Sequence, residues 1–296
     1  MSHPFAGVDG RTRPFAVLGH PIAHTLSPVM HNAAIRALGM NAIYLAFDVK
    51  PEDLIGILRG MGRMGFGGVN LTIPHKEVAY GGVDHLAETA IRAGSVNTIV
   101  FREDGSLEGH STDGYGLTRA VGEAFGKSFE NAEVLILGCG GAGRAAALEA
   151  AERGAARIRL ANRNPERAGK LAQELYAALP LTAIHVASAW PPPAAETRTA
   201  DFILNSTALG MKPDDDALLT PEHLHPGQAL LDMTYVLRET PMMRVAREAG
   251  AKAANGLGML LHQGARSFEI WTGSPPPLDP MRAALRETIY GETSDV

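Results

Sequence analysis

The sequence predicts an α/β protein with two domains, and three observations support this. The chain has 296 residues, about the length of two typical domains. Short apolar segments alternate with segments of helical periodicity, which favours largely parallel sheets covered by helices. In the middle of the chain an apolar segment leads directly into a glycine-rich turn and an alanine-rich helix. We therefore expect an N-terminal α/β domain with a mainly parallel sheet and a second domain of Rossmann type.

The composition excludes several classes of function. Hydrophobic residues make up 45% of the chain, charged residues 20%, and the formal net charge is -5, so no basic surface for nucleic acid is expected. The single cysteine, Cys139, excludes an internal disulfide. Residues 1–13 lack the apolar core of a signal peptide, and no apolar run approaches the ~20 residues of a membrane span. We expect a cytoplasmic protein without nucleic-acid or membrane partners.

The first half should begin with a buried strand at residues 15–19. The next helix should begin with Ser27 as its N-cap and Pro28 in the first helical position, and should end at Gly39 as a C-cap. The remaining pattern predicts strands at 42–48, 66–71 and 95–101, helices at 53–62, 77–90 and 117–125, a hairpin turn at 104–105 and a polar glycine-rich loop at 109–116.

The second half opens with a strand at 132–138, followed by a G-x-G-x-x-G turn at 138–143, a helix, and a strand at 158–163. In this context the turn strongly indicates a dinucleotide site. Its glycines let the backbone approach a pyrophosphate, and the helix N-terminus supplies amide groups and a favourable dipole. Cys139 in the turn is expected to pack rather than react. Further helices are predicted at 171–179, 240–249, 256–273 and 279–290, and strands at 201–205 and 229–235.

The residues after the second strand of this domain favour NADP over NAD. An NAD site usually places an acidic residue there to hold the ribose hydroxyls. This chain instead has Asn162 and Arg163, with Arg167 one helical turn further on. Guanidinium groups pair with a 2′-phosphate, which an acid would repel. The alternative is that both arginines form a solvated helix start. A polar turn that contains Thr207 is expected on the nicotinamide side.

A polar turn at residues 70–76 is the main candidate for the chemistry of the first half. Gly68 and Pro74 exclude a long helix through it, so a short strand that ends in a turn fits better. The carboxyl end of such a strand is where an open α/β sheet holds its ligands. Lys76 there can transfer a proton, although an isolated lysine is ordinarily a solvated surface residue. Thr25 and Ser27 bring hydroxyls to a helix start that suits a carboxylate.

Together these motifs resemble the shikimate dehydrogenase family. The resemblance runs from about residue 15 to residue 271 and departs from the family pattern at Thr25, where serine is usual, at Ser111, where asparagine is usual, and at Leu237, where proline is common. The matching motifs are residues 19–28 (GHPIAHTLSP), 70–76 (NLTIPHK), 94–98 (GSVNT), 111–116 (STDGYG), 138–143 (GCGGAG), 162–167 (NRNPER) and 256–263 (GLGMLLHQ).

The resemblance implies an NADP-dependent dehydrogenase that interconverts 3-dehydroshikimate and shikimate, with no metal. It implies Lys76 and Asp113 as the catalytic pair. The residues implied to bind substrate are Thr25, Ser27, Thr72, Asn97, Tyr235 and Gln263. Those implied to bind the cofactor are Gly138, Gly140, Gly141, Ala142, Gly143, Asn162, Arg163, Arg167, Thr207 and Gly256.

The predicted domains are a substrate domain at residues 1–113 and 256–296 and an NADP-binding Rossmann domain at 114–255, with the active site in the cleft between them. Relatives occur as monomers or dimers, so a homodimer is an open expectation. Three alternatives remain. The first is a quinate/shikimate enzyme with relaxed substrate or cofactor choice. The second is a non-catalytic NADP-binding sensor. The third is a folate-type dehydrogenase, which would not need the hydroxyls of Thr25 and Ser27.

Overall fold

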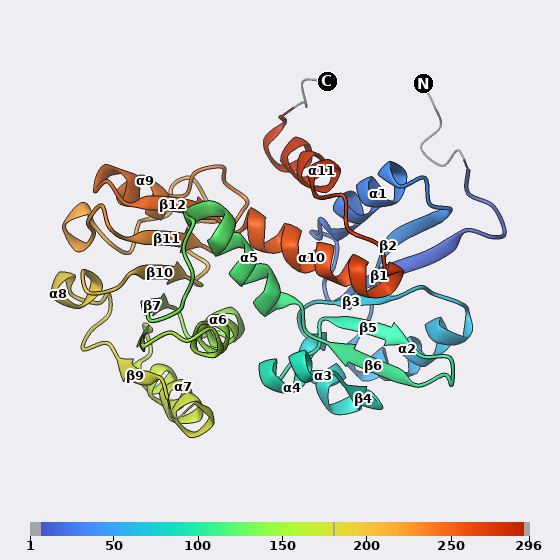
Figure 1. The fold of residues 1–296 in the computed structure, drawn as a ribbon, viewed down its shortest axis with the longest axis horizontal. Helices are drawn as coiled ribbons and strands as arrows, with labels where there is room; N and C mark the ends of the chain where they lie inside the picture. The colour runs from blue at the N-terminus through green and yellow to red at the C-terminus, as the bar shows by residue number, and fades with distance from the viewer. Residues whose placement is uncertain (1–6, 180, 293–296) are drawn as a thin grey trace. The chain divides into compact units, whose positions relative to one another are not determined.

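The computed structural model describes residues 7–179 and 181–292. The chain divides into two compact units, Met1–Tyr115 with Leu261–Val296 and Gly116–Leu260. Each unit contains one six-stranded sheet with helices packed on it (Figure 1). The predicted α/β class, with two units and mostly parallel sheets, is confirmed. The functions that we assigned to the two segments, and their limits, stay predictions.

The sheet of the first unit has the strand order β2-β1-β3-β5-β6-β4. Strand β1 pairs in parallel with β2 and β3, whereas β5 is antiparallel to β3 and β6. The hairpin turn predicted at 104–105 connects β5 and β6, and Gly105 has the positive φ that such a turn requires. The strands are β1 (Arg13–Gly19), β2 (Ala42–Asp48), β3 (Val69–Leu71), β4 (His85–Leu86), β5 (Thr98–Phe101) and β6 (Leu107–His110).

Helices cover both faces of this sheet. One face packs against α2, α3 and α4 through alternate residues of β1 and β3, such as Leu18 and Leu71. Helix α11 lies beside α1 (Figure 1). The helices are α1 (Ser27–Ala37), α2 (Leu54–Arg63), α3 (His75–Gly82), α4 (Glu88–Ala93), α5 (Asp113–Phe125), α10 (Leu257–Thr272) and α11 (Leu278–Tyr290), of which α5 and α10 continue into the second unit.

The predicted caps of α1 were wrong by one residue at each end. Leu26, not Ser27, is the N-cap, and no side chain caps the helix. Ser27 instead lies inside the first turn, and its backbone N–H donates a hydrogen bond to the Thr25 hydroxyl at 3.3 Å. At the other end Leu38 is the C-cap. Gly39 follows it in the left-handed conformation with φ +61°, the position that favours glycine.

The predicted helix at 77–90 was also wrong. Helix α3 already ends at Gly82, and the chain then forms strand β4 before α4 begins. Glycine at both positions 81 and 82 weakens a helix there. In contrast, two helices begin earlier than predicted, since α3 contains Lys76 and α5 contains Asp113 in their first turns. Both predicted catalytic side chains therefore extend from helix N-termini.

An aromatic cluster fills the opposite face of the sheet. The imidazole of His31 stacks on Tyr44, with 4.2 Å between ring centroids and 8° between planes, and lies 5.7 Å from the Trp271 ring. The indole of Trp271 donates a hydrogen bond to the carbonyl oxygen of Ile99. His31 is only 1% exposed, and burial lowers its pKa to about 3. The protein thus folds around an uncharged imidazole.

This burial predicts acid sensitivity. Between the ordinary pKa of 6.5 and the folded pKa of about 3, the unfolded chain binds a proton at His31 that the folded chain does not, so stability falls as pH decreases. At about pH 4 the loss is of the order of 3 kcal/mol. His31→Phe should keep the stacking and remove this part of the loss, as measured by urea unfolding from neutral to acidic pH. His185→Phe, at an exposed histidine, is the control, and equal acid sensitivity in all three proteins would contradict the prediction.

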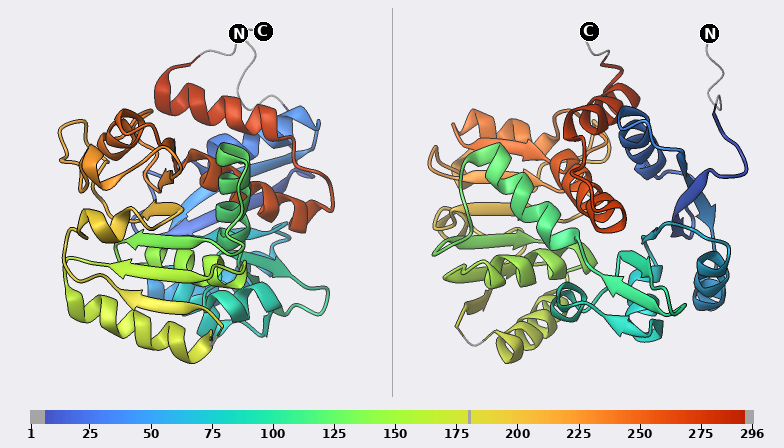
Figure 2. Two further views of the ribbon diagram at one scale, coloured as in Figure 1. Left: turned by 60° about the vertical axis from the view of Figure 1, so that its left-hand side comes forward. Right: turned by 45° about the vertical axis from the view of Figure 1, so that its right-hand side comes forward.

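The second unit has a fully parallel sheet with the order β12-β11-β10-β7-β8-β9. Counted within the unit, this is the doubly wound Rossmann order. Figure 2 shows α7 running beside β9. The strands are β7 (Glu133–Leu137), β8 (Arg157–Ala161), β9 (Ala183–Val186), β10 (Phe202–Asn205), β11 (Ala229–Asp232) and β12 (Lys252–Asn255), and the helices are α6 (Gly141–Glu152), α7 (Pro165–Ala178), α8 (Ala194–Thr197) and α9 (Pro241–Glu248).

Alternate strand residues of this sheet pack on two separate cores. Ile136 contributes to a core with α6 and α7, whereas Leu135 contributes to a core with α9. Helix α7 begins earlier than predicted, because Asn164 caps it by accepting from two backbone N–H groups and Pro165 occupies its first position. In the described part of the chain, no helix combines the length and apolar character that a bilayer crossing needs.

Candidate active site

The predicted catalytic pair is in contact. Lys76 Nζ donates a hydrogen bond to Asp113 Oδ2 at 2.6 Å. The lysine side chain is 30% exposed and the aspartate side chain 15%, so the pair is half-buried yet accessible to a small molecule. Lys76 follows β3 and Asp113 follows β6. The ends of two strands of the same sheet thus bring the ammonium group of Lys76 and the carboxylate of Asp113 together.

Helix geometry explains why the two groups stay paired. Lys76 lies in the first turn of α3, where the helix dipole disfavours a positive charge, and Asp113 lies in the first turn of α5, where the dipole favours a negative one. The turn before α3 is closed by a hydrogen bond from the His75 N–H to the Thr72 carbonyl oxygen at 2.8 Å. The negative charge of Asp113 therefore offsets the unfavourable interaction between the Lys76 ammonium group and the dipole of α3.

Two amide side chains complete this cluster. Asn97 Nδ2 donates to Asp113 Oδ1 at 2.9 Å and to Gln263 Oε1 at 3.4 Å. Asp113 thus uses one carboxylate oxygen for Asn97 and the other for Lys76. Gln263 comes from α10, far along the chain, and is half-buried. Four of the predicted site residues accordingly form one connected group.

The predicted carboxylate seat is organised locally. The Thr25 hydroxyl donates to Ser27 Oγ at 3.3 Å, in the loop between β1 and α1. Thr72 donates its backbone N–H to the Leu18 carbonyl oxygen at 3.0 Å, so its turn lies against the carboxyl end of β1. A Cβ at Gly19 would lie 2.6 Å from the Thr72 methyl group, so glycine is needed for this approach. These three hydroxyl residues leave neighbouring strand ends at the same edge of the sheet.

The glycine-rich turn of the second unit has no room for a side chain at Gly143. A Cβ at Gly143 would lie 1.9 Å from the Gly138 carbonyl oxygen, and Gly138 has φ +95°. Helix α6 begins at Gly141, so its free backbone N–H groups face the turn. A tight turn that opens a helix in this way fits a pyrophosphate.

Substitutions in this turn should have unequal effects. Gly143→Ala forces the backbone of the turn to move, and we expect a loss of roughly 1–3 kcal/mol of stability, typical of overpacking. Gly141→Ala is the matched control, because nothing lies within 4 Å of a Cβ there. Thermal and urea unfolding of the ligand-free proteins measure the difference. Equal stability of the two variants would contradict the close contact.

The predicted phosphate clamp lies beside the turn. Asn162 Oδ1 accepts the Cys139 backbone N–H at 2.9 Å, which connects the end of β8 to the turn. Arg163 and Arg167 are exposed, and Arg167 Nη2 lies 3.9 Å from the position of a Cβ on Gly140. Burial raises the pKa of the Cys139 thiol to about 11, so this cysteine stays protonated. The turn therefore offers backbone amide groups to a ligand, with the guanidinium group of Arg167 beside them.

The other predicted cofactor and substrate residues of this unit follow β10, β11 and β12. The Thr207 hydroxyl donates to Asn205 Oδ1 at 2.8 Å, and the Gly256 N–H donates to the Thr234 carbonyl oxygen at 2.9 Å. A Cβ at Gly256 would lie 2.2 Å from the Met233 carbonyl oxygen. Burial raises the pKa of Tyr235, so its phenol is a neutral hydroxyl. These residues lie at the carboxyl edge of the sheet, where such folds bind ligands.

Comparison with known proteins decides the family. Three domain families match: the shikimate dehydrogenase substrate binding domain at residues 17–99, the shikimate / quinate 5-dehydrogenase domain at 120–207 and the shikimate 5'-dehydrogenase C-terminal domain at 256–286. The shikimate dehydrogenase (NADP(+)) of Methanothermobacter thermautotrophicus is 42% identical, covering 95% of this chain and 99% of that protein. That of Moorella thermoacetica is 44% identical, covering 95% of each. The chain belongs to the shikimate dehydrogenase family.

A solved structure agrees with this membership of the shikimate dehydrogenase family. The shikimate 5-dehydrogenase of Thermus thermophilus, in complex with NADP(H) and shikimate, superposes with a TM-score of 0.80. It is 37% identical, and the match covers 93% of this chain and 99% of that chain. The family resemblance and the fold class predicted from sequence are thus confirmed. The roles of individual residues stay predictions.

In this member of the shikimate dehydrogenase family, two residues that sequence patterns did not reveal accept hydrogen bonds from the loops after β10 and β11. Asn205 and Asp232 are register neighbours at the carboxyl ends of β10 and β11. Asn205 accepts from Thr207, and Asp232 accepts from Thr240 Oγ1 at 2.7 Å. A polar residue that ends an apolar strand was the available signal, but Asn205 and Asp232 lie outside the seven motifs that carry the family resemblance.

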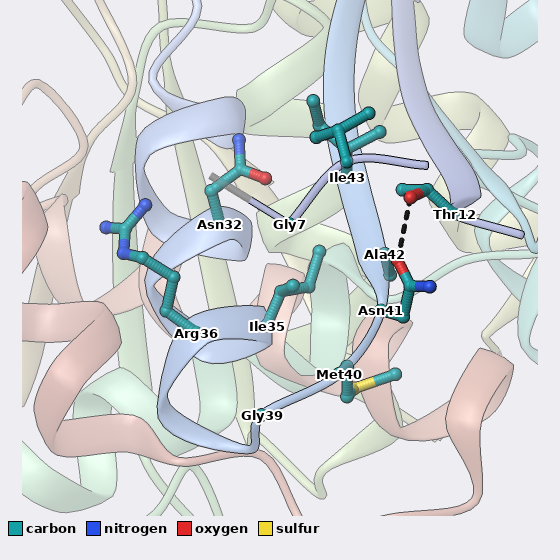
Figure 3. A pocket seen from close by; sticks show the side chains of 11 residues that line it. Gly7, Thr12, Asn32, Ile35, Arg36, Gly39, Met40, Asn41, Ala42 and Ile43 are labelled. Carbon is teal, nitrogen blue, oxygen red and sulfur yellow. Dashed lines mark hydrogen bonds between the residues drawn. The ribbon is translucent and has the colours of Figure 1, made fainter. Parts of the chain in front are cut away.

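A hollow elsewhere in the first unit is separate from these residues. It has a volume of about 690 Å³. Figure 3 shows Asn32, Ile35 and Arg36 extending from α1 on one side of it. Of the described residues that line it, none belongs to the predicted site. It lies at the amino end of β2, whereas the predicted substrate residues of the first unit follow carboxyl ends of strands.

Proposed function

We propose that this protein is an NADP-dependent shikimate dehydrogenase that catalyses the reversible reduction of 3-dehydroshikimate to shikimate. The product serves the biosynthesis of aromatic amino acids, and we place the enzyme in the cytoplasm. The observation that carries this proposal is the contact between Lys76 Nζ and Asp113 Oδ2 at 2.6 Å, with Asn97 bound to the other carboxylate oxygen. Such a group can deliver a proton to a carbonyl and hold the hydroxyl that results.

The residues divide the work of the reaction. NADPH, when bound, supplies the hydride. Lys76 donates a proton to the carbonyl oxygen of the substrate as negative charge develops there, and accepts it in the reverse direction. Asp113 fixes the lysine by their hydrogen bond and holds the reacting hydroxyl. Asn97 and Gln263 bind ring hydroxyls.

The substrate carboxylate has its own seat in this proposal. Thr25, Ser27 and Thr72 supply hydroxyls for it, beside the N-terminus of α1. Tyr235 of the second unit is a further substrate-binding residue in this proposal, through its neutral phenol. For the cofactor, the turn at residues 138–143, including Ala142, holds the pyrophosphate, and Asn162, Arg163 and Arg167 hold the 2′-phosphate. Thr207 and Gly256 border the nicotinamide.

Quinate is the second candidate substrate, because of one residue. Thr25 adds a methyl group to a seat that usually has serine, and its hydroxyl already contacts Ser27 at 3.3 Å. The methyl group of Thr25 crowds the substrate carboxylate and shifts the substrate ring. This favours a relative of shikimate such as quinate. Thr25→Ser should therefore raise the ratio of shikimate to quinate turnover if quinate is a substrate of the parent enzyme.

Initial rates with shikimate and quinate, each with NADP and NAD, test the proposal on the purified protein. Activity confined to shikimate with NADP is the expected result. Quinate turnover equal to or above that of shikimate would move the assignment to the quinate enzymes. No turnover in any mixture, together with retained NADP binding, would favour the sensor. Light scattering on the same sample distinguishes a monomer from the homodimer that we also propose.

A further inference from the structure

Buried polar side chains lie directly behind Asn97. They come from four elements of the first unit, namely β2, β3, β5 and α10, and all are at most 6% exposed. Their hydroxyl and amide groups contact one another rather than water. The members are Tyr44, Asn70, Thr98 and Ser267.

Hydrogen-bond chemistry fixes the direction of this series from its active-site end. The backbone N–H of Thr112 can only donate, and it lies 2.9 Å from Asn97 Oδ1. The Asn97 amide nitrogen therefore faces Asp113. Since Asn97 Oδ1 accepts, the Thr98 hydroxyl at 2.9 Å must donate to it. The hydroxyl of Ser267 must then donate to Thr98 Oγ1 at 2.7 Å, because Thr98 has a single proton.

The hydrogen bonds at the opposite end agree with this direction. Asn70 Nδ2 lies 3.0 Å from the backbone carbonyl oxygen of Asn97, which can only accept, so this nitrogen donates. It also donates to Ser267 Oγ at 2.9 Å. Asn70 Oδ1 then accepts from the Tyr44 hydroxyl at 2.7 Å. Burial raises the pKa of Tyr44 well above its ordinary value, so the phenol keeps its proton.

We propose that Thr98 and Ser267 are positioning residues: the directional series of hydrogen bonds through their hydroxyls acts together with the Thr112 backbone N–H to hold the Asn97 amide with its nitrogen toward Asp113. This proposal rests on the proposed function, in which Asp113 and Asn97 meet the substrate. A reversed amide would place its oxygen against a carboxylate oxygen at the distance that is now 2.9 Å. Two acceptors repel there, so Asp113 would lose its position beside Lys76.

The first test replaces Thr98 in two ways. Thr98→Val keeps the shape of the side chain and removes the hydroxyl, and we expect kcat to fall roughly tenfold. Thr98→Ser keeps the hydroxyl and loses a fully buried methyl group, so it should lose stability while kcat stays within about twofold. A packing role would give the reverse order. A Thr98→Val enzyme with the kcat of the parent would overturn the proposal.

The second test asks whether Thr98 acts through Asn97. In an Asn97→Ala background, Thr98→Val should change kcat by less than about twofold, because the group it positions is gone. A further tenfold fall there would mean that Thr98 acts by another route. The Michaelis constant for NADP should stay unchanged in all of these variants, since the series contains no cofactor residue.

The third test uses two hydroxyls on α10. The hydroxyl of Thr272 donates to the Phe268 carbonyl oxygen at 2.8 Å. Ser267 Oγ lies 3.1 Å from the Gln263 carbonyl oxygen in the same way, but it gives its single proton to Thr98 Oγ1 at 2.7 Å. Ser267→Ala should lower kcat roughly fivefold, whereas Thr272→Val should leave it within about twofold. Equal effects of the two substitutions would assign Ser267 a role in helix stability alone.

One readout does not depend on activity and separates this proposal from the proposed function. The side-chain amide signals of Asn97 in a proton–nitrogen NMR spectrum are assigned by their loss in Asn97→Asp. They should shift in Thr98→Val and stay in place in Thr98→Ser. If the parent protein turns over no substrate but the signals behave in this way, the proposed dehydrogenase function is wrong, whereas the proposed positioning of Asn97 is supported. Unshifted signals in Thr98→Val would overturn the positioning.

Discussion

Lys76→Ala should lower kcat by roughly 10²–10⁴, the range for loss of a group that donates or accepts a proton. The substitution removes the ammonium group that lies 2.6 Å from Asp113, and it leaves the developing charge on the substrate oxygen without a proton donor. Binding of NADP should be unchanged, because the lysine belongs to the first unit and the predicted cofactor residues to the second. Steady-state kinetics with shikimate and NADP measure the effect.

A surface lysine provides the control for this experiment. Lys50→Ala removes the same charge from an exposed position in the same unit, and its kcat should stay within about twofold of the parent. Circular dichroism confirms that both variants are folded. A Lys76→Ala enzyme that also stays within about twofold of the parent would remove Lys76 from the mechanism.

Replacement of both Arg163 and Arg167 by alanine should weaken NADP binding by roughly 10²-fold. Both side chains are exposed, and Arg167 lies beside the glycine-rich turn. Guanidinium groups make charge-assisted hydrogen bonds to a phosphate such as the 2′-phosphate. NAD lacks this phosphate, so its affinity should change little and the preference between the cofactors should narrow or reverse. Calorimetric titration with each cofactor measures both affinities.

Arg244 provides the matched control for the double variant. It is exposed on α9 of the same unit, so Arg244→Ala tests the general effect of one lost positive charge. NADP affinity in this variant should stay within about twofold of the parent. An equal loss for NADP and NAD in the double arginine variant would show that the arginines stabilise the turn instead of reading the phosphate.

The fold was predictable where local patterns and long-range packing agree. The glycine-rich turn between β7 and α6 was predictable from its glycines, because residue 143 has no room for a side chain. The edge strands β9 and β12 were missed because their residues are half-exposed and lack the apolar run of the central strands. Their pairing partners, not their own propensities, make them strands.

The site was predictable through motifs and not through geometry. Lys76 and Asp113 are 37 residues apart in the chain, and the family resemblance alone placed them together. Serine is a residue type that often caps helices, but the backbone N–H of Ser27 donates a hydrogen bond to the Thr25 hydroxyl. Ser27 lies inside the first turn of α1, and Leu26 is the N-cap. Ser267 lies 169 residues from Thr98, and no local pattern connects a serine within α10 to a buried threonine on β5.

The order of the chain has a consequence for synthesis. The second unit, Gly116–Leu260, is one continuous segment, whereas the first unit needs Leu261–Val296 as well as its N-terminal part. Trp271 of that late segment bonds to Ile99, and Ser267 bonds to Asn70. A ribosome therefore releases all residues of the second unit while the first still lacks the helix that fills one face of its sheet. On the aromatic face of the nascent first sheet, the contacts of Ser267 and Trp271 cannot form until α10 has emerged from the ribosome.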